Sequence, residues 1–293
     1  ALFSIDPSNG FVKAMVGGKN YKKGNFNRAI SSLRQPGSSF KPVVYLAALQ
    51  KKMAMNSVME DSPVKIGNWS PKNYDGVYRD SMTLAKALEI SNNVIPVKLL
   101  QYVGIDAAEK VWRNAGIVGG DFPKNYTLAL GSISTRPVDM AMFYAALANG
   151  GFKYQPYLVS RVDHLDGTPK KIFSPKRIGS LPLSKATMDV VCEALRRVMQ
   201  KGGTGGNLFE NYPISIAGKS GTAETNGLDN GWFIAYGPFE KPEIVIACMF
   251  EHAGFGADSA APVVKKVMDA YFHFGEYAFA KDRSGAVLRK KGN

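Results

Sequence analysis

The stretch "QPGSSFKP", residues 35–42, lies where the chain changes from an extended to a helical pattern. Its Pro-Gly pair is typical of a turn that ends an extended segment, and a serine such as Ser38 is a favoured residue for opening a helix. If the helix begins there, Ser38 and Lys41 are three residues apart, so their side chains lie on one face at contact distance. The proline after the lysine is acceptable only if the helix has just begun.

A serine and a lysine in this arrangement can form a reactive pair. A hydroxyl at a helix start lies at the positive end of the helix dipole, beside free backbone N–H groups that would stabilise an oxyanion. Serine becomes a good nucleophile when a base takes its proton, and Lys41 can do so if burial or a second cation lowers its pKa from about 10.4. The alternative, a capping serine beside a surface lysine, stays open on spacing alone, because Ser-x-x-Lys is a weak pattern.

The patterns on either side of this stretch indicate the fold class. Residues 2–5 and 11–16 alternate like paired strands around the turn "DPSNG". From about residue 39 to 201, apolar residues recur at three- and four-residue spacing, which predicts helices, including one helical region over 81–104. Strand patterns then return, followed by a final helix, in 213–224, 230–239, 243–251 and 259–274. We therefore predict an α+β fold: an antiparallel sheet built from N- and C-terminal strands, flanked by helices, with a large mainly helical insertion.

The chain is expected to form one domain over 1–293, with a sheet subdomain and a helical subdomain. The sheet part would comprise about 1–37 plus 208–275, and the helical part about 38–207. Because the chain begins with Ala1, inside a strand-like segment and without Met, we expect it to be a fragment of a longer protein. No apolar run approaches the roughly 20 residues that span a bilayer. Loops are predicted at 67–80 and 201–207, and the first contains aromatic residues that would line a cleft or pack locally: Trp69, Tyr74 and Tyr78.

Composition limits the classes of partner. The 293 residues are 45% hydrophobic, enough for a full core, and the formal net charge of +13 favours either an anionic partner or a solvated basic surface. No zinc-finger spacing or RNA-binding aromatic motif accompanies the basic pairs, so nucleic acid is not expected as a partner. The two cysteines, Cys192 and Cys248, are expected as buried free thiols. The three histidines lack ligand spacing, and no metal or organic cofactor is expected: His164, His252 and His273.

Two further segments carry polar residues where the pattern is otherwise regular. "ISNNVIP" places three of them within a helical region, where they compete with backbone hydrogen bonds: Ser91, Asn92 and Asn93. "AGKSGTAE" places four within a strand-like run, and its glycine would let another chain or a ligand approach the backbone: Lys219, Ser220, Gly221 and Thr222. A surface turn and an edge strand with a solvated lysine are the ordinary explanations. Together with "SSFK", and in this order, the segments favour a shared site.

The three segments "SSFK", "SNN" and "KSGT" resemble an established signature, the S-x-x-K, S-D-N and K-T-G trio of class A β-lactamases and penicillin-binding proteins. Stretches such as "LFSIDPSNGFVKAMVGG", "FNRAISSLRQPGSSFKPVVYLAAL" and "GWFIAYGP" resemble the transpeptidase domain of bifunctional class A penicillin-binding proteins. The resemblance covers about residues 2–270. Asn92 stands where the signature has Asp, and Ser220 where it has Thr, but both keep short hydrogen-bonding side chains.

The resemblance implies roles in acyl transfer for four side chains. Ser38 would attack the peptide bond between the last two D-alanines of a peptidoglycan stem peptide and form an acyl-enzyme. Lys41 would accept the Ser38 proton. Ser91 would bridge Lys41 and Lys219 and help to protonate the leaving amine. Lys219 would supply positive charge that keeps Lys41 deprotonated.

The remaining residues of the trio would bind the substrate. Asn93 would hold amide groups of the donor peptide, and the hydroxyls of Ser220 and Thr222 would bind its terminal carboxylate beside Gly221. The backbone N–H groups of Ser38 and Thr222 would form the oxyanion hole. An amine of a neighbouring stem peptide would then take the acyl group, and water in its place would give a D,D-carboxypeptidase side activity. β-Lactams would acylate Ser38.

The same resemblance implies a setting. The domain would act at the outer face of the bacterial cytoplasmic membrane, in the periplasm or cell-wall space. It would contact the membrane only through a segment absent from this chain, and the N-terminal glycosyltransferase half and the anchor of class A members would also lie outside it.

Rival functions come from other classes. A serine β-lactamase shares the trio but needs a residue that activates water, a Glu in class A, whereas Glu109 and Glu193 fall in helical patterns. A non-catalytic β-lactam sensor or wall-binding module is the second rival. A phosphate loop at "AGKS" fails on spacing, because Pro213 occupies the position that needs glycine.

Overall fold

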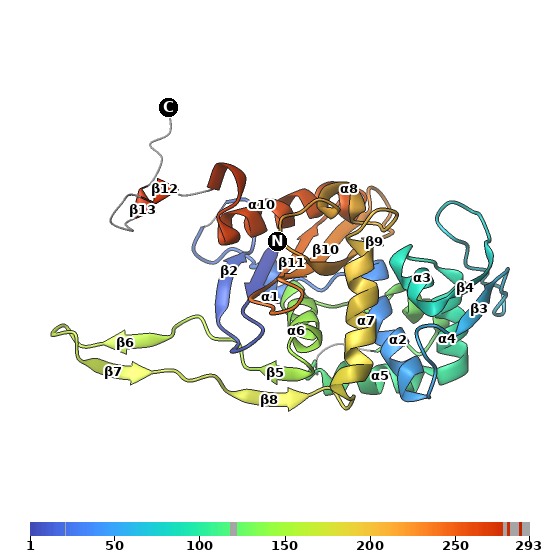
Figure 1. The fold of residues 1–293 in the computed structure, drawn as a ribbon, viewed down its shortest axis with the longest axis horizontal. Helices are drawn as coiled ribbons and strands as arrows, with labels where there is room; N and C mark the ends of the chain where they lie inside the picture. The colour runs from blue at the N-terminus through green and yellow to red at the C-terminus, as the bar shows by residue number, and fades with distance from the viewer. Residues whose placement is uncertain (21, 118–121, 278–279, 282–286, 289–293) are drawn as a thin grey trace.

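A five-stranded antiparallel sheet lies at the centre of the molecule and is built from both ends of the chain (Figure 1). The structure is a computed structural model that describes residues 1–20, 22–117, 122–277, 280–281 and 287–288. The sheet order is β2-β1-β11-β10-β9, so β9 is an edge strand. The strands are β1 Leu2–Ile5, β2 Val12–Val16, β9 Ala217–Ala223, β10 Asn230–Gly237 and β11 Ile244–Phe250. The predicted α+β class and the predicted origin of the sheet are confirmed.

Both faces of this sheet are buried, which explains its apolar strands. Along β10, Trp232 and Ile234 join one hydrophobic core, whereas the alternate residues Phe233 and Ala235 join another. Helix α6 (Pro137–Ala148) packs on the first face, and α10 (Ala261–Phe272) packs on the second (Figure 1). The sheet is therefore a rigid support for side chains at its β9 edge.

The helical part surrounds α2 (Lys41–Gln50). Residues 41–48 are all buried, because α2 packs against α4, α5 and α7. A helix that is apolar on every side belongs in the interior, and its first turn is held in place by this packing. The helices around it are α3 Leu84–Glu89, α4 Val94–Val103, α5 Ile105–Asn114 and α7 Lys185–Val198.

Further short elements connect the sheet and the helices. They are α1 Arg28–Ser31, α8 Gly206–Phe209, α9 Gly256–Ser259, η1 Gly37–Phe40, η2 Tyr126–Leu130, η3 Gly275–Tyr277, β3 Val58–Asp61, β4 Asp80–Thr83, β12 Ala280–Lys281 and β13 Val287–Leu288. Within the ranges that the structure describes, no helix is both long and apolar enough to cross a bilayer.

The prediction of one helical region over 81–104 was wrong. Strand β4 covers its start, and the helices α3 and α4 are separated at residues 90–93. Ser91 has a φ of +59°, a left-handed conformation that no α-helix contains. The break coincides with the polar residues of "SNN", so these residues interrupt a helical pattern that the apolar spacing alone would continue.

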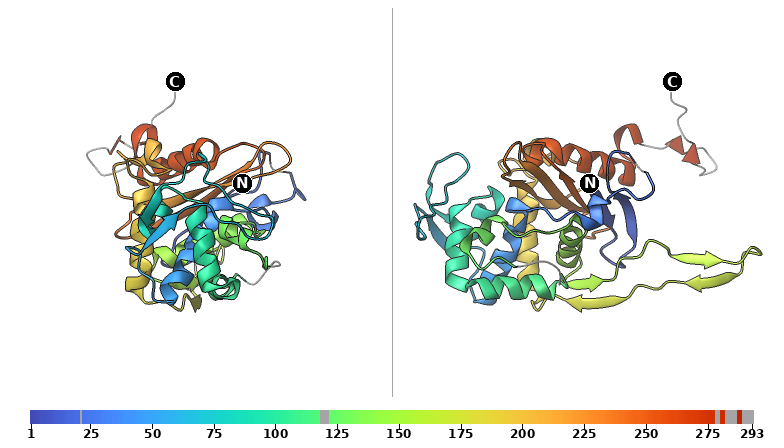
Figure 2. Two further views of the ribbon diagram at one scale, coloured as in Figure 1. Left: turned by 90° about the vertical axis from the view of Figure 1, so that its right-hand side faces the viewer. Right: turned by 180° about the vertical axis from the view of Figure 1, so that it is seen from behind.

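A long two-stranded ribbon inside the mainly helical region was also not expected. It pairs β5 (Phe152–Tyr154) with β8 (Arg177–Ser180) and β6 (Arg161–Asp163) with β7 (Pro169–Ile172). The ribbon extends away from the body of the molecule, as the reverse view in Figure 2 shows. Residues 158–172 are all exposed, so this part of the ribbon has no buried face that would give its sequence a two-residue apolar period.

Candidate active site

The three sequence segments meet through two buried lysines. Lys41 Nζ donates hydrogen bonds to the Ser91 backbone oxygen at 2.7 Å, to Ser91 Oγ at 3.2 Å and to Asn93 Oδ1 at 2.7 Å. Lys219 Nζ donates to the same Ser91 Oγ at 2.8 Å. The Ser91 hydroxyl therefore lies between two lysines, one from the start of α2 and one from the edge strand β9.

Burial sets the protonation of both lysines. Lys41 and Lys219 are 0% exposed, so the ordinary explanations of a surface lysine at either place were wrong. Burial, together with the charge of Lys219, lowers the pKa of Lys41 well below its usual value. Burial also lowers the pKa of Lys219 to about 7. Neither amine has an ion-pair partner among the described residues, so one proton between them is more favourable than two.

The left-handed turn at Ser91 makes this contact possible. In this conformation both the carbonyl oxygen and the hydroxyl of Ser91 accept hydrogen bonds from Lys41. Asn92 follows, and its Oδ1 accepts from the first backbone N–H groups of α4, those of Val94 at 2.9 Å and Ile95 at 2.8 Å. The polar residues thus replace the hydrogen bonds that an uninterrupted helix would make.

Ser38 lies in η1, one turn before α2, and lines the cleft. The adjacent hydroxyl, that of Ser39, is buried and donates to Pro36 O at 2.7 Å, whereas that of Ser38 has no hydrogen-bond partner in the described part of the chain. The structure shows no hydrogen bond between Ser38 and Lys41. Such bonds are often long without substrate and tighten when substrate binds.

Two glycines bring the backbone of β9 against η1. Gly37 has a φ of +55°, and a Cβ there would lie 2.1 Å from Thr222 O. A Cβ at Gly221 would lie 2.2 Å from Pro36 O, so the close approach expected at Gly221 is to the same chain. Only glycine permits this spacing, which places the backbone of Thr222 beside the turn that carries Ser38.

A cleft of about 990 Å³ opens above this arrangement. The site residues predicted from sequence that line it are Ser38, Ser91, Asn93, Ser220, Gly221 and Thr222. Lys41 and Lys219 are not among the lining residues, in keeping with their burial. Of the loop aromatics, Trp69 and Tyr74 line the cleft, and Tyr74 meets Phe255 edge-to-face with ring centroids 5.1 Å apart.

Several polar residues of the cleft were not predicted from the sequence. Thr204 Oγ1 lies 2.9 Å from Ser220 Oγ, and Thr127 and Ser132 also line the cleft. Thr204 belongs to the glycine-rich loop at 201–207, which was visible as a loop. Nothing in the local sequence indicates that this loop would lie beside the edge strand.

Comparison with known proteins identifies the relatives of this chain. The family model of the penicillin binding protein transpeptidase domain matches residues 1–269. Penicillin-binding protein 1A of Neisseria gonorrhoeae is 32% identical over 285 residues, which are 90% of this chain and 34% of that protein. Penicillin-binding protein 1A of Pseudomonas aeruginosa is 35% identical over 184 residues, 61% of this chain and 22% of that protein. The chain thus spans about a third or less of these relatives.

Solved structures show the same fold. Penicillin-binding protein 1A from Haemophilus influenzae has a TM-score of 0.81 and 28% identity, covering 91% of this chain and 47% of that one. The imipenem acyl-enzyme complex of penicillin-binding protein A from M. tuberculosis has a TM-score of 0.83 and 22% identity. The match covers 92% of this chain and 73% of that one. From the family match and the Neisseria relative together, this chain belongs to the family of penicillin-binding protein transpeptidase domains.

Proposed function

We propose that this chain is a D,D-transpeptidase domain that cross-links peptidoglycan through an acyl-enzyme on Ser38. The observation that carries the proposal is the hydrogen-bonded series from Lys41 through Ser91 to Lys219 beside the cleft that Ser38 lines. It combines a nucleophile that has no competing partner among the described residues, a buried amine with a lowered pKa, and a hydroxyl that can pass a proton.

In the acylation step, neutral Lys41 takes the proton of Ser38 as Ser38 Oγ attacks the carbonyl carbon of the penultimate D-alanine. The backbone N–H groups of Ser38 and Thr222 stabilise the oxyanion. The C–N bond then breaks, and Ser91 gives its proton to the departing amine while it receives one from Lys41. The terminal D-alanine leaves, and the ammonium of Lys219 balances the charge on this relay.

The substrate would lie along the edge strand β9. The hydroxyls of Ser220 and Thr222 would bind its terminal carboxylate beside Gly221, and Asn93 would bind its amide groups. In the second step the amine of a neighbouring stem peptide attacks the ester of Ser38. Water in place of that amine would give D,D-carboxypeptidase activity.

The setting is part of the same proposal. The domain would act outside the cytoplasm, at the outer face of the bacterial membrane, as one part of a longer enzyme like the relatives that it matches. Its sheet part would be about residues 1–37 and 208–275, and its helical part about 38–207. β-Lactams would acylate Ser38, an expectation that the family membership supports. The formal charge of +13 favours anionic wall polymer as a neighbour.

The decisive experiment is intact-mass analysis after brief exposure to a penicillin, followed by a chase in drug-free buffer. A single adduct that persists through the chase and maps to the peptide containing Ser38, with release of D-alanine from a stem peptide, is expected of a transpeptidase. Rapid loss of the adduct with hydrolysed drug would instead identify a β-lactamase. Absence of any adduct would leave a non-catalytic wall-binding module.

The acylation rate is expected to follow a bell-shaped pH curve. It rises with pH as Lys41 becomes neutral, since only the neutral amine accepts a proton. It falls above about pH 7, because Lys219 has a pKa of about 7 and loses the ammonium that supports Ser91. The two apparent pKa values of the curve belong to Lys41 and Lys219 as a coupled pair. Initial rates of labelling by a fluorescent penicillin across about pH 5 to 10 measure the curve, and a rate that rises steadily toward the usual lysine pKa of about 10.4 would contradict it.

A further inference from the structure

Two buried polar side chains lie in and beside the loop at 67–80, which lines the cleft. Asp61, at the end of β3, is 0% exposed, and Asn73 is 6% exposed, although the neighbours Lys72 and Tyr74 are exposed. Burying a carboxylate and an amide is unfavourable unless their hydrogen bonds are satisfied. The partners of these two side chains therefore indicate what the burial achieves.

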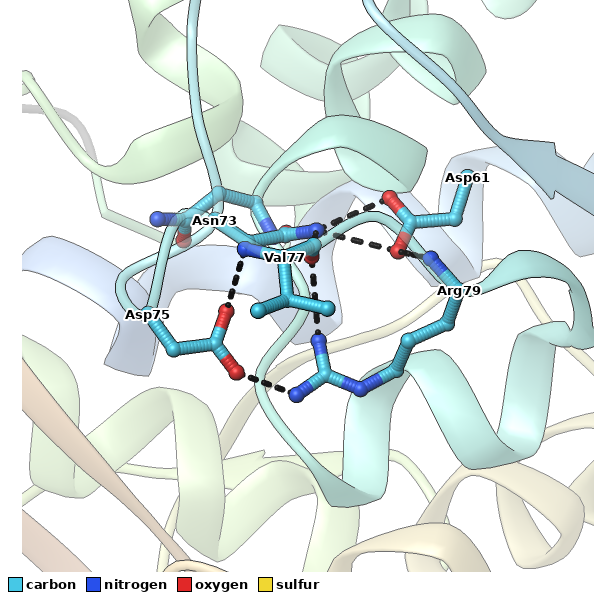
Figure 3. A network of polar contacts seen from close by, with 6 residues as sticks. Asp61, Asn73, Asp75, Val77 and Arg79 are labelled. Carbon is cyan, nitrogen blue, oxygen red and sulfur yellow. Dashed lines mark hydrogen bonds and ion pairs between the residues drawn. The ribbon is translucent and has the colours of Figure 1, made fainter.

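Every polar atom of the Asn73 side chain has a partner. Its Nδ2 donates to both carboxylate oxygens of Asp61 at 3.0 Å and to Val77 O at 2.8 Å (Figure 3). Its Oδ1 accepts from the backbone N–H of Asn93 at 2.9 Å. Because an ionised carboxylate only accepts hydrogen bonds, Asp61 turns the nitrogen of the Asn73 amide toward itself and leaves the oxygen for Asn93.

Further contacts hold Asp61 and close the loop. The backbone N–H of Arg79 donates to Asp61 Oδ2 at 3.0 Å, and the guanidinium of Arg79 pairs with the carboxylate of Asp75 (Figure 3). Asp61 thus accepts from two donors, Asn73 and Arg79. The loop is held by the contact of Arg79 with Asp61 and by the ion pair of Arg79 with Asp75.

The loop holds Asn93 at two points. Its backbone N–H donates to Asn73 Oδ1, and its Nδ2 donates to Lys72 O at 3.0 Å. With Nδ2 held there, Asn93 Oδ1 faces Lys41 Nζ at 2.7 Å. An amide nitrogen has two hydrogens, so one N–H of Asn93 remains for an acceptor in the cleft.

We propose that Asn73, oriented by Asp61, is a positioning residue that holds Asn93, and through it Lys41, in the arrangement needed for acylation of Ser38. The inference rests on the proposed function of the site. Asp61 and Asn73 belong to none of the three signature motifs, so the motifs assign them no role. Their effect passes through Asn93, whose amide would otherwise turn between two orientations of similar shape, only one of which presents oxygen to Lys41.

The test compares Asn73→Ala with the wild type in rapid-mixing acylation by a fluorescent penicillin, which separates the binding step from the covalent step. The covalent rate constant is expected to fall about tenfold, as for loss of one hydrogen bond to a charged group. The acidic limb of its pH curve is expected to move to lower pH, because the ammonium of Lys41 loses an acceptor while Lys219 still opposes its charge. A purely structural residue would lower the melting temperature and leave both quantities unchanged.

Asn68→Ala is the matched control, because Asn68 is an exposed asparagine of the same loop that does not line the cleft. It should acylate like the wild type. Asp61→Asn keeps the shape of the side chain at position 61 but no longer favours one orientation of the Asn73 amide. It should therefore slow the covalent step about threefold. If Asn73→Ala does not fold, this variant decides the question. Wild-type rates and pH curves in Asp61→Asn, or in folded Asn73→Ala, would overturn the inference, whereas failure of the wild type itself to react would overturn the proposed function.

Discussion

Replacing Ser38 with alanine is expected to abolish covalent labelling by penicillin. Every bond-forming step of the proposed reaction uses Ser38 Oγ, and alanine has no atom that could form the ester. Binding without reaction should persist, since the cleft and its other hydrogen-bonding groups are unchanged. Intact-mass analysis after exposure to a penicillin should therefore show one adduct on the wild type and only the unmodified mass for Ser38→Ala.

Ser39→Ala provides the control, because two serines are adjacent here and only one should react. The Ser39 hydroxyl is buried and donates to Pro36 O, so its loss should cost about 1 kcal/mol of stability and leave the adduct in place. An adduct that survives in Ser38→Ala but disappears in Ser39→Ala would reverse the assignment. An adduct that survives in both would place the nucleophile elsewhere in the chain.

The sheet and the main helices were predictable because each buries an apolar face. Strand β10 places Trp232 in one core and Phe233 in the other, so its sequence is a short, continuous apolar run that is typical of a buried strand. The Pro-Gly turn marked the start of helical structure, but a turn of 3₁₀ helix, Gly37–Phe40, comes first, and α2 itself begins at Lys41 and not at Ser38. The ribbon at 152–180 was not predictable in this way, because most of it is exposed and packs on no core.

The candidate site was predictable as a set of residues but not as a geometry. The three motifs indicated that Lys41, Ser91 and Lys219 belong together. The spacing of the apolar residues, however, predicted a helix through Ser91. The left-handed turn there depends on Lys41, which is 50 residues away in the sequence. Local spacing cannot reveal a conformation that a distant side chain stabilises.

The supporting contacts were hidden for a similar reason. Asn73 is 12 residues from Asp61 and 20 from Asn93, inside a loop where a polar side chain is expected to be exposed. A buried amide in such a loop has no local periodic signal. It becomes visible only when the fold brings β3 and the start of α4 to the same loop.

Replacing Lys41 with methionine is expected to slow acylation of Ser38 about a thousandfold, the size of effect typical of a lost general base. Methionine fills a similar volume but cannot accept a proton. Stability should change little, because the loss of hydrogen bonds to Ser91 O and Asn93 Oδ1 is offset by replacing a buried polar amine with an apolar side chain of similar volume. The labelling rate with a fluorescent penicillin and the melting temperature, measured on the same sample, separate these effects.

The control for this variant is Lys98→Met. Lys98 donates to Glu60 O at 2.9 Å and to Ser62 Oγ at 2.8 Å, and it does not line the cleft, so acylation should continue at the wild-type rate. Lys219→Met tests the other candidate base. If Lys219→Met loses acylation completely while Lys41→Met keeps a near wild-type rate, then Lys219 takes the proton through Ser91.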